Sequence, residues 1–107
     1  MDAAKFDRSI TVRRKTVKNG PLGATESWGT LCTVWAGRRD VSDGEKAAAG
    51  TVMSTLVARF TVRSSDATRS IRPADTITEG RLTFDVVGIK ELGRRDYLEI
   101  TAQARLD

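Results

Sequence analysis

The chain is 107 residues long, with 39% hydrophobic residues, 30% charged residues and a formal net charge of +4. This length suits a single domain with a modest core, and the composition is neither that of a membrane-spanning protein nor that of a disordered one. No apolar run reaches the roughly 20 residues of a transmembrane helix, and residues 1–8 lack the apolar centre of a signal peptide, so we expect a cytoplasm-like compartment.

The chain contains no histidine and a single cysteine, Cys32. The absence of histidine excludes Ser-His-Asp and Cys-His catalytic groups and His-containing zinc sites. No phosphate-binding P-loop and no acid/base pair of carboxylates is recognisable. We therefore predict no enzymatic activity, no metal site and no cofactor, and we expect Cys32 to act as a small buried hydrophobe.

Alternating residues predict a first strand over residues 8–17, after a flexible N-terminal extension over residues 1–7. Ile10 and Val12 are expected to face the core, while their polar neighbours face solvent. The sequence Asn19-Gly20-Pro21-Leu22-Gly23 then predicts a hairpin tip, because asparagine and glycine accept positive φ and proline does not continue a strand ladder.

The returning strand is predicted from about Thr25 to Ala36 and contains both tryptophans, Trp28 and Trp35. Its aromatic and β-branched residues fit a pleated surface, and we expect the strand to be buried with most aromatic side chains inside. A capping box followed by three alanines then predicts a short helix over residues 42–49.

Further alternating segments predict strands over residues 51–63, 76–78, 81–89 and 97–105. Between them, residues 64–70 are expected to form a polar loop and residues 90–96 a charged hairpin loop. The predicted fold is therefore mainly β: a small antiparallel barrel or sandwich of five to six strands, with one short helix between the second and third strands. Residues 1–107 are expected to form one domain.

Several short features follow one another in a specific order. They are residues 7–12, a glycine-rich turn, Trp28, and residues 33–36, 43–45, 59–63, 71–75, 80–89 and 95–100. Their combination resembles the head-tail joining family of long-tailed bacteriophages, whose members are also called head-closure or stopper proteins. The resemblance covers residues 6–104. Gene transfer agents carry similar parts, so the particle need not be an infectious phage.

The resemblance implies a small β-barrel that assembles into a homo-oligomeric ring, sixfold or twelvefold, in the neck of a virion or phage-like particle. Such a ring closes the DNA channel after packaging and offers a docking surface to the tail. The implied partners are a portal or adaptor protein above, a tail terminator or tail-tube protein below, and DNA in the channel through non-specific contacts. No membrane is involved, and assembly would take place in the host cytoplasm.

Three groups of residues are candidates for these contacts, and each also has a simpler structural explanation. A candidate subunit-interface or lumen segment, which would otherwise cover one barrel end, contains Arg38, Arg39, Asp40, Asp43, Glu45, Lys46, Ala47 and Ala48. A candidate tail- or partner-docking hairpin, otherwise an ordinary surface turn, contains Lys18, Asn19, Gly20, Pro21, Leu22 and Gly23. Candidate DNA- or acidic-partner-facing residues, otherwise a solvated strand face, are Arg13, Arg14 and Lys15.

The main alternative function is that of a small β-barrel that binds nucleic acid. Such modules stack bases on exposed aromatic side chains beside a basic groove. The chain has two tryptophans, one tyrosine and three phenylalanines, and most of them are expected to point inward. The sequence therefore gives this alternative less support.

Overall fold

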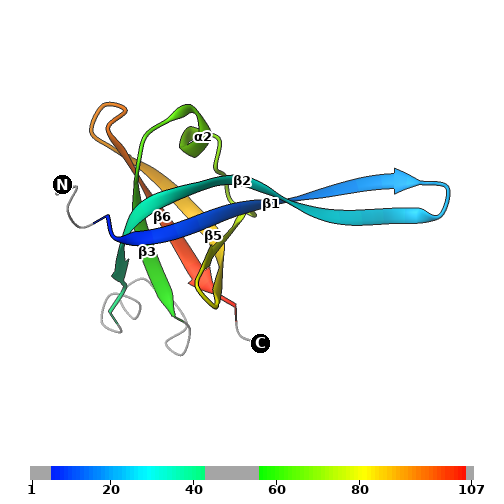
Figure 1. Ribbon diagram of the computed structural model, residues 1–107, viewed down its shortest axis with the longest axis horizontal. Helices are drawn as coiled ribbons and strands as arrows, with labels where there is room; N and C mark the ends of the chain where they lie inside the picture. The colour runs from blue at the N-terminus through cyan, green and yellow to red at the C-terminus, as the bar shows by residue number, and fades with distance from the viewer. Residues whose placement is uncertain (1–5, 43–55, 106–107) are drawn as a thin grey trace.

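The computed structural model describes residues 6–42 and 56–105. Six antiparallel strands form one sheet that closes into a barrel in the order β1-β2-β3-β6-β5-β4 (Figure 1). The strands are β1 (Arg8–Gly20), β2 (Gly23–Asp40), β3 (Val57–Arg63), β4 (Thr76–Glu79), β5 (Leu82–Leu92) and β6 (Tyr97–Ala104), and a short helix, α2 (Asp66–Arg69), lies between β3 and β4. The predicted mainly β fold is confirmed.

The core fills the inside of the closed sheet. Its largest members are Phe60 of β3 and Phe84 of β5, whose rings meet edge to face with centroids 5.2 Å apart. Within the barrel, side chains along the strands alternate between the inner and outer faces, and Ile10 and Val12 are buried as predicted. The other buried apolar residues of this cluster are Ala36, Ala58, Val62, Ile71, Ile77, Val86, Leu98, Ile100, Ala102 and Ala104.

Helix α2 replaces part of the polar loop predicted over residues 64–70. Ser65 caps the helix by accepting a hydrogen bond from the amide of Thr68, and the Thr68 hydroxyl accepts one from the Ser65 amide. This is a capping box with threonine in the place usually taken by glutamate or glutamine, which is why the pattern was not recognised in the sequence. The helix predicted over residues 42–49 falls, apart from Ser42, outside the described residues.

The hairpin between β5 and β6 is tighter than the charged loop predicted over residues 90–96. Lys90 and Glu91 continue β5 and pair with Glu99 and Leu98 of β6, so the turn occupies residues 93–96. Charged residues on the outer face of a sheet are compatible with a strand, so the charges of Lys90 and Glu91 do not mark the end of β5. Residues 51–55 of the long strand predicted over 51–63 lie outside the described residues.

The prediction that β2 is buried is wrong. Trp35 is 62% exposed and Trp28 is 37% exposed. Ala36 faces inward, so its neighbour Trp35 projects from the outer surface, opposite Ser9 of β1. Strand propensity alone did not reveal which face each tryptophan occupies.

β1 and β2 continue together well beyond the barrel and form the long horizontal ribbon of Figure 1. The molecule consequently measures 49 × 32 × 25 Å. A β-bulge between Val12 and Arg13 marks the place where the ribbon leaves the barrel. Bulges bend a strand and increase its twist, so this irregularity helps to set the direction of the ribbon.

Candidate functional site

The projecting ribbon, which we call the arm, consists of residues 14–29. Arg14 pairs with Gly29 at its root and Gly20 pairs with Gly23 at its tip, so the register is regular throughout. Every residue from 15 to 30 is exposed. An isolated two-stranded ribbon is marginally stable in water, so the arm is a candidate for an element that packs on another molecule.

The tip of the arm confirms the turn predicted from the sequence. Pro21 and Leu22 form the two-residue loop, and Gly23 has a φ of +107°, which glycine adopts without strain. The side chain of Leu22 is fully exposed. The candidate docking hairpin thus presents an apolar side chain at the point of the molecule farthest from the barrel (Figure 1).

The two faces of the arm differ in chemistry, because directly paired residues share a face. One face carries the pairs Lys15 with Trp28 and Val17 with Glu26, and an ion pair of 2.9 Å joins Lys15 to Glu26. The other face carries Lys18 and, at the root, Arg14 among small and hydroxyl-bearing residues: Thr16, Gly20, Gly23, Thr25, Ser27 and Gly29. One face is therefore amphipathic and the other is nearly flat.

An ion pair at the root ties the arm to the barrel. The Arg14 guanidinium donates to both carboxylate oxygens of Asp75 at 2.9 Å and to the Ser70 carbonyl at 2.6 Å. The Arg72 amide also donates to Asp75, whose side chain is 4% exposed. Burial alone would raise the pKa of Asp75, but the hydrogen bonds from Arg14 and Arg72 outweigh burial and hold that pKa below its ordinary value.

The structure brings the three basic candidates together at the root of the arm and gives each a partner within the chain. Arg14 binds Asp75 and Lys15 pairs with Glu26, while Arg13 donates to the Trp28 carbonyl at 3.4 Å. Nearby, Arg105 lies over the Trp28 ring at 5.7 Å. These contacts give each of the three basic residues a structural role within the chain. Their contact with DNA or an acidic partner stays a prediction.

Arg38 lies at one end of the barrel, in a network of charges. Its guanidinium contacts Glu79 at 3.0 Å and Asp40 at 2.8 Å, and Arg8 reaches the same Glu79 at 3.0 Å. Arg38 also lies over the buried Phe84 ring, 5.5 Å from its centroid. The side chain is 14% exposed, so Arg38 helps to close this end of the barrel.

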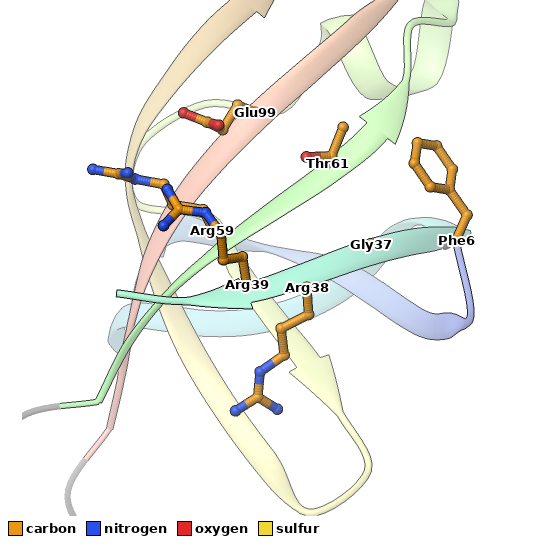
Figure 2. Close-up of a pocket in the computed structure, with 7 residues that line it drawn as sticks. All are labelled: Phe6, Gly37, Arg38, Arg39, Arg59, Thr61 and Glu99. Atoms are coloured by element: carbon orange, nitrogen blue, oxygen red, sulfur yellow. The ribbon is translucent and has the colours of Figure 1, made fainter. Parts of the chain in front are cut away.

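Arg39 points the other way, to the outer wall. It pairs directly with Arg59 of β3, and the two line a shallow hollow with Phe6, Gly37, Arg38, Thr61 and Glu99. Figure 2 shows the side chains of Arg39 and Arg59 together on one side of β2, near Glu99, with Arg38 on the opposite side. Asp43, Glu45, Lys46, Ala47 and Ala48, the remaining residues of this candidate segment, lie outside the described residues.

The structure reveals an aromatic patch that sequence reasoning missed, formed by Phe6, Trp35, Arg63 and Tyr97. Phe6 packs edge to face on Tyr97 with centroids 5.6 Å apart, and Arg63 lies over the same Tyr97 ring at 6.0 Å. Phe6, Trp35 and Arg63 also line one hollow. Tryptophan, tyrosine and arginine are the residues most enriched at the energetic centres of protein interfaces, so the patch is a second candidate contact surface.

Other kinds of site receive no support from the described residues. Within residues 6–42 and 56–105, no group of three His, Cys, Asp or Glu side chains is placed to hold a metal ion. In the same part of the chain, no helix has the length and apolar character needed to cross a bilayer. Cys32 is partly buried, and burial together with the nearby Asp75 charge raises the pKa of its thiol, which disfavours the reactive thiolate.

Comparison with known proteins gives a matching family and similar solved structures, among them the two described next. The model of a family described as phage head completion protein matches residues 1–105. A protein from Shigella flexneri 2a, solved in solution, has a TM-score of 0.76 and 19% identity, over 97% of this chain and 96% of that one. A chain in the virion of a native gene transfer agent particle has a TM-score of 0.68 and 23% identity, over 91% and 92%. The comparison with curated protein sequences finds no significant match.

Proposed function

Because the chain belongs to the phage head completion protein family, we propose that it forms a ring in the neck of a phage or phage-like particle. The family gives the chain a structural role in such a particle, in agreement with the resemblance noted in the sequence. The finer proposal is that the ring closes the DNA channel after packaging and provides the surface on which the tail docks. A portal or adaptor protein would lie above this ring and a tail terminator or tail-tube protein below it.

The arm is the observation that carries this proposal. A closed ring of more than two copies needs two different surfaces that fit each other, since its contacts are heterologous. The chain offers an exposed arm on one side and an outer wall with the aromatic patch and the hollow around Arg39 on the other. One of the similar structures comes from a gene transfer agent virion, which supports placing this chain in a comparable particle.

The proposal is tested by assembling particles without the chain. We expect heads that package DNA but then lose it, and that carry no tails. Negative-stain images would count tailed particles, and nuclease-protected DNA would measure retention. The wild-type chain supplied in trans is the control and should restore both. Tailed particles that hold their DNA without the chain would contradict the proposed function.

Charge reversal at Arg39 tests the outer wall as a subunit contact. Arg39→Glu reverses a charge on the exposed outer face, directly opposite Arg59, and changes no core residue, so the chain should still fold into the barrel. We expect fewer complete particles from a chain whose circular dichroism spectrum matches that of the wild type. Arg38→Glu is unsuitable for the same test, because it would place a third carboxylate beside Glu79 and Asp40 and destabilise the barrel end. Normal particle yield with Arg39→Glu would exclude this contact.

The exposed tryptophan gives the nucleic-acid-binding alternative a specific observation in its favour. Trp35 is 62% exposed and lines the same hollow as Arg63, so an aromatic face and a cation lie together. Of the six aromatic side chains only Phe60 and Phe84 are buried, so the prediction that most of them point inward is wrong. Salt-sensitive binding of single-stranded DNA by the purified chain, lost in Trp35→Ala, would favour this function over the ring.

A further inference from the structure

The two edges of the arm have opposite character. The β1 edge, residues 14–20, carries three cations: Arg14, Lys15 and Lys18. The β2 edge, residues 23–29, carries one charge, Glu26, and contains neither lysine, arginine nor proline. Among the described strands, β4 pairs with β1 only at residues 11–13 and β3 pairs with β2 only from Ala36 onward. Each arm strand is therefore paired with the other strand and with no further described one.

An open strand edge presents unpaired backbone N–H and C=O groups and accepts another strand. Proteins protect such edges with lysine, proline or bulges. The β1 edge has this protection through Lys15 and Lys18, whereas the β2 edge of the arm carries a single charge, Glu26. The less protected β2 edge has the properties of a site at which a further strand is added.

We propose that the β2 edge of the arm is covered by the β1 edge of a second copy, so that neighbouring arms join into one continuous sheet. This inference rests on the proposed ring and names the surface through which its copies meet. Rotation about a ring axis keeps the arms side by side. The outgoing β1 of one copy then runs antiparallel to the returning β2 of the next, as in the hairpin itself.

Charge selects this pairing over the two others that the arm permits. Pairing β1 with β1 would bring Lys15 and Lys18 of both copies together, and like charges directly opposite destabilise a sheet. Pairing β2 with β2 would leave Glu26 without a cation across the new contact and would give a twofold dimer instead of a ring. Pairing β1 with β2 in the register of the hairpin places Lys15 of one copy on the same face as Glu26 of the next and diagonally opposite it.

The experiment mixes ¹⁵N-labelled and unlabelled wild-type chain, allows the mixture to assemble and adds a carbodiimide, which joins a lysine to a carboxylate in direct contact. We expect cross-linked peptides of mixed isotope that join Lys15 of one copy to Glu26 of the next. The Lys15–Glu26 pair within one copy yields same-isotope peptides and serves as an internal control for the reaction. Among residues 24–29, hydrogen exchange at the amides that point away from β1 should slow by at least about tenfold on assembly, because these amides gain a strand partner.

A matched pair of variants tests the charge argument. Glu26→Lys gives the β2 edge its own lysine and should weaken self-association at least about tenfold, or about 1.4 kcal/mol. Glu91→Lys makes the same change of charge on β5, outside the arm, and should leave association unchanged.

Three outcomes would overturn the inference: same-isotope cross-links alone in the assembled chain, no protection of the amides among residues 24–29 that point away from β1, or a chain that stays monomeric at every concentration tested. A chain located in the particle neck with an unprotected arm edge contradicts this inference and leaves the proposed function standing. A chain that is absent from the particle contradicts the proposed function itself.

Discussion

Replacing residues 17–26 with Asn-Gly is expected to reduce complete particles at least about 100-fold, since a loss of about 2.7 kcal/mol at a subunit contact has that effect. Thr16 and Ser27 lie directly opposite each other, so a two-residue turn joins them without changing the register. The change removes the outer half of the arm, including Leu22 and Glu26, and no core residue. Particle yield measured by negative-stain counting checks the result.

The stability of the barrel should hardly change when the arm is shortened. The residues removed are all exposed, and surface changes of this kind usually alter stability by less than about 0.5 kcal/mol. Circular dichroism and urea unfolding of the shortened chain would verify that it folds. Leu22→Asn is a matched control that keeps the length of the arm and removes its apolar tip. Normal particles from the shortened chain would show that the arm has no part in assembly.

The sequence was sufficient to predict the strands, because the residues that face the core alternate clearly in β3, β5 and β6. It also predicted the hairpin tip, since Asn19-Gly20 and Pro21 leave few other conformations. It did not predict how far the hairpin would project. Alternation around Val17 and Trp28 resembles that of a half-buried strand, and only the three-dimensional pairing shows that no described element covers this segment.

The candidate site was harder to predict than the fold, because its parts come from distant segments. Arg14 and Asp75 are separated by 61 residues, and no local pattern links them. The aromatic patch likewise joins Phe6, Trp35 and Tyr97 from three segments. Part of the patch follows from alternation along β2: because Ala36 faces the core, its neighbour Trp35 faces outward.

Asp75→Asn is expected to lower the free energy of unfolding by about 2–3 kcal/mol at pH 7, because it leaves the Arg14 guanidinium with a neutral partner. Asp75 accepts hydrogen bonds from Arg14 and from the Arg72 amide, and its side chain is almost completely buried. Urea unfolding of the two chains measures the difference. Glu26→Gln is the matched control: it breaks the exposed ion pair with Lys15 and should cost less than about 0.5 kcal/mol.

The loss of stability caused by Asp75→Asn should become smaller as the pH falls into the acid range. The fold lowers the pKa of Asp75. Its carboxylate therefore stabilises the native state fully above the pKa of aspartate in the unfolded chain, about 3.9. This contribution is lost as the pH falls through the lower pKa of the native state. The difference between wild type and variant should therefore be constant from about pH 8 to pH 5 and shrink below about pH 4. A difference that stayed constant into the acid range would mean that Asp75 stabilises the arm root by its shape and hydrogen bonds alone, without its charge.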